Sequence, residues 1–182
     1  MKFVTIVASM GLALASGLSY AEDNAKLKQL YESDQWERKP TGFTIDPGLV
    51  EAHDRDRREA VLDVIRRGEP LTANDYYHAA TVFQHGSTAE DNALAYSLAL
   101  LASRLDASNS QARWLAAAAW DRSLMRRNKP QWYGTQYVKN QSTGKWELYQ
   151  IDEAAVSDAE RERNGVPSIS KAKERVKSLN GE

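Results

Sequence analysis

The chain has 182 residues, with 24 basic and 25 acidic side chains, a formal net charge of −1 and no cysteine. This near-balance of charge argues against a basic surface that would bind nucleic acid. Because cysteine is absent, disulfides, thiol nucleophiles, thiolate metal sites and the lipid-attachment cysteine of bacterial lipoproteins are all excluded.

The N-terminus has the pattern of a secretory signal peptide. A single Lys2 precedes an apolar stretch over about residues 3–18, and small residues occupy the first and third places before a cut after Ala21. The apolar stretch is shorter than the roughly 20 residues needed to cross a bilayer, which argues against a membrane anchor. We therefore expect residues 1–21 to be removed and the rest to be exported to the periplasm or beyond, with no membrane span after cleavage.

Helical spacing of apolar residues predicts five helices in the first two thirds of the mature chain. Pro40 ends the first and Gly68 the second, and the patterns Thr72–Asp75 and Ser87–Glu90 are capping boxes that begin the third and fourth. The expected ranges are about 24–38, 48–67, 72–86, 87–105 and 110–127, with a loop over 41–47. Short connections predict that the last three helices are antiparallel.

The same spacing predicts which residues each helix buries. The second helix should present a solvated charged face from His53 to Glu59, and its predicted buried residues are Leu49, Val61, Leu62 and Ile65. In the fifth helix, the alanine run 116–119 should let a neighbouring helix come close, and the predicted inner residues are Trp114, Leu115, Ala118, Asp121, Leu124 and Met125.

After Pro130 the pattern changes from helical to alternating. Residues 136–139 and 146–149 alternate around a Ser-Thr-Gly turn, which predicts a β-hairpin near 134–150. A short helix should follow Ser157, and a charged C-terminal helix or solvated tail should occupy 169–182. The predicted fold is thus mainly α, an antiparallel helical bundle or hairpin stack of about five helices with one C-terminal β-hairpin, forming a single domain over 22–168.

Residues 129–137, directly after the fifth helix, form the densest cluster of polar and aromatic side chains in the chain. Amides, a hydroxyl and aromatic rings are the groups that orient and stack against a small polar ligand. Two further polar pairs, Gln84-His85 and Asp121-Arg122, belong to the third and fifth helices. We hypothesise that these segments form one site, in which the ligand-binding residues are Gln84, Gln131, Trp132, Tyr133, Thr135 and Gln136.

The same cluster permits catalysis. His85 would act as a general base oriented by Asp121, with Arg122 or Gln136 holding an oxyanion. The alternative is structural, because His85 and Arg122 each lie where a cation complements the carbonyl end of a helix.

We expect no metal and no cofactor. His78 and His85 are seven residues apart on one predicted helix, about 10 Å along its axis, which is too far to share one metal ion. The chain also has no nucleophile elbow, phosphate loop, zinc-protease helix or dinucleotide fingerprint.

Four segments occur in the order seen in the bacterial domain-of-unknown-function family 6624: Asp34-Gln35-Trp36-Glu37-Arg38, Gln84-His85, Asp121-Arg122 and Pro130-Gln131-Trp132-Tyr133-Gly134-Thr135-Gln136. The chain resembles this family over roughly residues 30–170, and the last segment is the most specific. Gly86-Ser87 stand where an acidic residue often follows the Gln-His pair. The resemblance implies a largely helical domain with a polar site built from these motifs, and the family has no established activity to transfer.

Three functions remain open at this point. The first is binding of a small polar or sugar-like ligand, the second is a metal-independent hydrolase or transferase that uses His85 and Asp121, and the third is interaction with an envelope protein. An open pocket lined by the candidate residues would favour binding or catalysis, whereas buried and mutually satisfied side chains would favour a structural role.

Overall fold

The computed structural model describes residues 22–39 and 46–182. The predicted signal peptide and most of the predicted loop over 41–47 lie outside these residues. The described part holds seven helices and two strands, in the order α1 (Ala25–Glu37), α2 (Pro47–Arg66), α3 (Ala73–Gln84), α4 (Ala89–Leu105), α5 (Ser110–Arg126), β1 (Tyr137–Lys139), β2 (Trp146–Leu148), α6 (Asp158–Arg163) and α7 (Ile169–Leu179).

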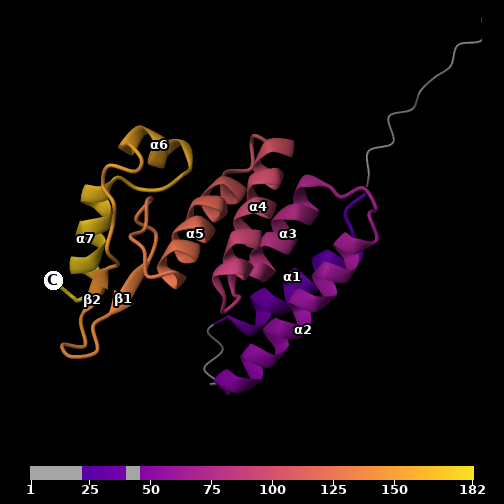
Figure 1. Ribbon diagram of the computed structural model, residues 1–182, viewed down its shortest axis with the longest axis horizontal. Coiled ribbons are helices and arrows are strands. Elements are labelled where there is room, and N and C mark those ends of the chain that lie inside the picture. The colour runs from indigo at the N-terminus through magenta and orange to yellow at the C-terminus, as the bar shows by residue number, and fades with distance from the viewer. Residues whose placement is uncertain (1–21, 40–45) are drawn as a thin grey trace, which may run out of the picture.

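The helices are arranged in a row. Helices α1 and α2 form one end, followed by α3, α4 and α5, while the hairpin, α6 and α7 lie beyond α5 (Figure 1). Consecutive helices from α3 to α5 contact each other along their length, as short connections require. The predicted mainly α fold with one C-terminal hairpin is confirmed. None of the helices in the described ranges is long and apolar enough to cross a membrane.

Side-chain caps begin α3 and α4. The Thr72 hydroxyl accepts from the Asp75 amide while the Asp75 carboxylate accepts from the Thr72 amide, which confirms the predicted capping box. The box of α4 joins Thr88 and Asp91, one residue later than predicted. Asp91 packs closely on Gly86, and a Cβ added to Gly86 would lie only 2.3 Å from the Asp91 Cβ. This close contact occurs together with the later start of α4.

The main hydrophobic core lies among helices α1 to α5. Small residues dominate the contact between α4 and α5, where the alanine run 116–119 is buried and brings the two backbones close, as predicted. Larger side chains fill the space between α1, α2 and α3, and the principal ones are Leu27, Leu30, Val61, Val64, Val82 and Phe83.

Three predictions of burial are wrong. Leu49 is 49% exposed because 3.6 residues per turn places it about 120° around α2 from the buried Val61. Asp54 and Arg57, seven and four residues before Val61, share its face, so the predicted solvated charged face is partly buried. Trp114 of α5 is 45% exposed and lines a cavity described below.

The C-terminal segments form a second small unit around the hairpin. Strands β1 and β2 pair antiparallel, with Tyr137 opposite Leu148. The Asn180 side chain, just after α7, accepts from the Trp146 amide and donates to the Trp146 carbonyl, and Ala172 of α7 is buried. The C-terminal helix is therefore packed against the hairpin rather than forming a solvated tail.

Candidate functional site

A cavity of about 470 Å³ lies between the end of α1, the end of α3 and one face of α5. We call it the first cavity. It includes three of the residues singled out from the sequence, and its principal polar lining residues are Gln35, Gln84, His85, Gln111 and Arg122, with Trp114 and Tyr77 as the aromatic ones.

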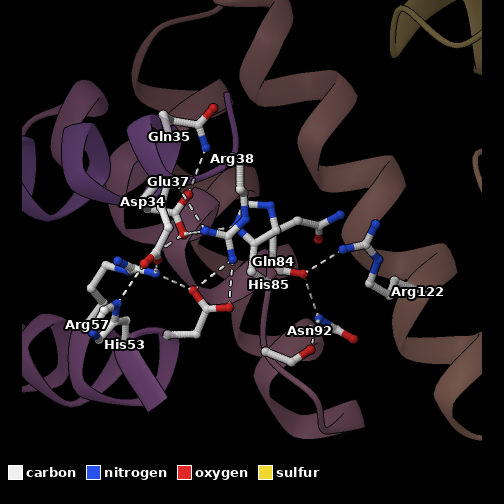
Figure 2. A network of polar contacts seen from close by, with 12 residues as sticks. Asp34, Gln35, Glu37, Arg38, His53, Arg57, Gln84, His85, Asn92 and Arg122 are labelled. Atoms are coloured by element: carbon white, nitrogen blue, oxygen red, sulfur yellow. Dashed lines mark hydrogen bonds and ion pairs between the residues drawn. The ribbon is translucent and has the colours of Figure 1, made fainter. Parts of the chain in front are cut away.

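His85 is held in the first cavity by a buried carboxylate. Its Nδ1 atom lies 3.0 Å from Oδ1 of Asp34, a residue with no exposed surface (Figure 2). Asp34 is itself fixed, because Arg38 contacts Oδ1 at 2.8 Å and the Gln35 amide donates to Oδ2 at 2.8 Å. With Nδ1 engaged, Nε2 is the ring nitrogen left for a ligand.

The carboxylate beside His85 is thus Asp34 and not Asp121, which corrects the predicted pairing. Asp34 and His85 are 51 residues apart in the sequence, so the contact depends on how α1 packs on α3. The sequence signal for Asp34 is its helical spacing from Leu27 and Leu30, which places it on the buried face of α1.

A network of buried ion pairs lies behind Asp34 and joins α1 to α2. Arg38 donates to both carboxylate oxygens of Asp54, at 2.7 and 2.6 Å, and Arg57 bridges Asp54 and Glu37 at 2.6 and 2.5 Å (Figure 2). His53 contacts Glu37 at 2.6 Å. The predicted solvated face of α2 therefore supplies the partners that hold Asp34 and its neighbours in place.

Hydrogen bonds in this network lower the pKa values of Asp54 and Glu37. Burial alone would raise the pKa of Asp54, but the bonds from Arg38 and Arg57 outweigh it and lower the pKa. Burial opposes the same change in Glu37, where the bonds from His53 and Arg57 prevail and the pKa is lowered. Both acids are therefore held in their charged forms.

Arg122 brings a cation to the first cavity without an acidic partner. Its Nη1 donates to the Gln84 carbonyl at 2.8 Å (Figure 2). Its Nε donates to the Gln136 side chain at 3.2 Å, so both acceptors are neutral. All acidic residues of the chain fall within the described ranges, and none of them forms an ion pair with Arg122. Burial lowers the pKa of Arg122, and repulsion from Arg126 and Arg38 lowers it further.

Gln84 presents an unpaired polar atom beside this cation. Its side chain is only 5% exposed, and Oε1 has no hydrogen-bond partner among the described residues. A buried acceptor without a partner costs roughly 1–3 kcal/mol. The main-chain carbonyl of Gln84 is by contrast fully used, because it accepts from Arg122 and from the Asn92 side chain.

Asp121 fixes the loop that follows α5. Its carboxylate has no exposed surface and accepts four hydrogen bonds, from the amides of Trp132, Tyr133 and Thr135 and from the Thr135 hydroxyl, at 2.8–3.0 Å. Neither Asp121 nor Thr135 lines the first cavity. The Asp121 carboxylate is thus used to hold the loop, and this geometry gives no support to its predicted catalytic role. Thr135 lines a separate cavity of about 260 Å³.

Two glutamines complete this loop. Gln131 is fully buried, donates to the carbonyls of Gln136 and Tyr149, and accepts from the Gln136 amide. The Gln136 side chain accepts from Arg122 and donates to the Ala118 carbonyl, so it joins the loop to the first cavity. Gln131 is a structural residue, and Gln136 positions Arg122.

The aromatic residues of the loop lie away from the first cavity. Tyr133 is half-buried, and burial raises the pKa of its phenol. Trp132 contacts Trp120 of α5, with ring centroids 5.1 Å apart. The predicted single site is therefore divided, because the structure brings together Gln84, His85 and Arg122 but not the aromatic residues.

No cluster of side chains suited to a metal ion occurs in the described ranges. Comparison with known proteins adds nothing to the geometry, since no family model matches the chain and neither a characterised protein nor a solved structure shows significant similarity. The resemblance noted from the sequence motifs stays a prediction.

Proposed function

We propose that the protein binds a small polar molecule with an anionic group, such as a carboxylate, in the first cavity. The observation that carries this proposal is the cation of Arg122, which lines the cavity and pairs with no acidic side chain in the described ranges. Most guanidinium groups that are shielded from water are paired with an anionic group. A bound anion would supply it.

The neighbouring groups support a ligand that also carries a hydrogen-bond donor. Two of the five guanidinium N–H groups donate to Gln136 and Gln84, which leaves the others without a hydrogen-bond partner among the described residues. Oε1 of Gln84 accepts from a hydroxyl or amine on the ligand, and Nε2 of His85 adds one further polar contact. A volume of about 470 Å³ lies within the range of small-molecule sites.

The cell envelope is the proposed location. The support is the signal-peptide pattern of residues 1–21.

The test is ligand-induced stabilisation of the mature protein. Millimolar acetate, phosphate or N-acetylated amino acids should raise the melting temperature by mass action. Arg122→Gln should abolish the rise, whereas Arg126→Gln, an exposed arginine one turn further along α5, should retain it. Equal rises in both variants, or none in the native protein, would rule the proposal out.

A metal-independent hydrolase or transferase is the second candidate. It is favoured by the contact of 3.0 Å between Asp34 and His85, which orients the imidazole as a general base requires. In this mechanism Asp34 takes the orienting role that was predicted for Asp121. Arg122 would stabilise the negative charge that develops on the substrate in the transition state. The test is turnover of nitrophenyl esters or phosphates. Turnover that disappears in His85→Gln and survives in His53→Gln would support catalysis. Absence of turnover in the native protein would leave ligand binding as the remaining function.

A further inference from the structure

A second cavity, of about 600 Å³, lies on the opposite face of α5 from the first. At 100° per residue, Trp120 and Arg127 point away from the side that carries Arg122. The loop after α5 closes the second cavity with Lys129 and Trp132, and Asp152 lies at its rim. None of these residues lines the first cavity.

Two indole rings form a corner in the second cavity. Trp120 and Trp132 meet edge to face, with an interplanar angle of 64°, and Tyr96 packs on the other side of Trp120 with ring centroids 5.2 Å apart. Trp132 keeps 36% of its surface exposed, so part of its ring is open to a ligand. Nε1 of Trp120 is buried and has no hydrogen-bond partner among the described residues.

The exposed Trp132 is held unusually firmly by its backbone. Its amide donates to Asp121 at 2.8 Å, and its carbonyl accepts from Arg161 at 2.7 Å. Asp121 and Arg161 are both buried, with at most 1% exposure. A rigid aromatic ring loses little conformational entropy when a ligand stacks on it, and such rings are typical of binding surfaces.

The polar groups at the rim are a donor and an acceptor. Lys129 is exposed and forms no ion pair with any residue in the described ranges, and its ammonium has three donors. Asp152 is exposed and carries a carboxylate, which accepts only. An aromatic face next to both kinds of hydrogen-bonding group suits a sugar ring, whose C–H face is apolar and whose edge carries hydroxyls.

We propose that the second cavity binds a pyranose saccharide, with one ring stacked on Trp132 and its hydroxyls bonded to Lys129 and Asp152. A flat aromatic acid fits less well, because the corner offers one face and one edge rather than two parallel faces. This site is independent of the anion proposed for the first cavity.

The test is titration of the mature protein with maltotriose, cellotriose and chitotriose, followed by the NMR signals of the five indole N–H groups. We expect one of these sugars to shift the signals of Trp120 and Trp132 at millimolar concentration. No shift with any of the three, or an equal response to benzoate, would overturn the proposal.

Variants separate stacking from general surface effects. Trp132→Ala should weaken the affinity about tenfold or more, whereas Trp146→Ala, with 37% exposure on the hairpin, should leave it unchanged. Asp152→Ala removes one hydrogen bond of an exposed turn, from the Ala154 amide at 3.1 Å, and should weaken binding while the protein stays folded, which guards against a Trp132 variant that unfolds. Equal losses in Trp146→Ala and Trp132→Ala, or an unchanged affinity in Asp152→Ala, would contradict the proposal.

Discussion

Asp34 connects the polar network of α1 and α2 to the first cavity. It is fully buried, and it contacts Arg38, Gln35 and His85. A buried carboxylate of this kind is favourable only while all of its partners remain, because removing one charge leaves the others buried without a partner. The same atoms that orient His85 therefore also support the fold.

Asp34→Asn should lower the free energy of unfolding by about 3 kcal/mol or more, since Arg38 and Arg57 lose a nearby negative charge. Denaturant unfolding of the purified protein measures it. Asp56→Asn is the matched control, because its pair with Arg55 is exposed and should be worth less than about 1 kcal/mol. Similar stabilities of the two variants would mean that the network contributes little.

Stability should fall in acid because of Asp54 and Glu37. Their ordinary pKa values are 3.8 and 4.5, and both are lowered in the folded protein. The stability they contribute is complete above these ordinary values and is lost as the pH falls through the lower folded values. Unfolding free energies measured from neutral pH downward should show this decline, and Asp54→Asn should make it shallower. A decline of the same slope in the variant would assign the acid sensitivity to other groups.

At the scale of elements, the loop 131–136 is fixed to α5 by side chains rather than by regular secondary structure. Asp121 binds three of its amides, Gln131 spans it from within, and Gly134 adopts φ +86°, a conformation that glycine tolerates best. This arrangement holds Gln136 against Arg122 on one side and Trp132 in the second cavity on the other. One buried carboxylate thus supports both cavities.

Asp121→Asn should loosen this loop, because an amide cannot accept from all four donors as a carboxylate does. Amide hydrogen exchange at Trp132, Tyr133 and Thr135 should become about tenfold faster or more, while exchange in α4 stays unchanged. Protection that is equal in the variant and the native protein would show that other contacts hold the loop.

Local sequence signals predicted most elements of this fold. Helical periodicity, the Thr72–Asp75 capping box and the turn between alternating segments each depend on residues close in the chain. Local signals could not predict the contact between Asp34 and His85, because these residues are 51 positions apart in the chain. Nor did they predict that Asp54 and Arg57 are buried, because charged side chains are usually expected to face solvent. Likewise the polar density of residues 129–137 indicated a ligand site, whereas much of it serves to fix the loop.

At the scale of the whole molecule, α5 separates two cavities of different chemistry. The first has a half-buried cation and an oriented imidazole, and the second has an aromatic corner with polar groups at its rim. The first lies between α1, α3 and α5, whereas the second lies between α5 and the segments that hold Lys129, Trp132 and Asp152.

The most direct test of the proposed anion site is an NMR titration of the arginine Nε–Hε signals with acetate and phosphate. The Arg122 signal should shift and saturate, while that of the exposed Arg126 on the same helix should not. Uniform small shifts of all arginines, or a stationary Arg122 signal, would contradict anion binding in the first cavity.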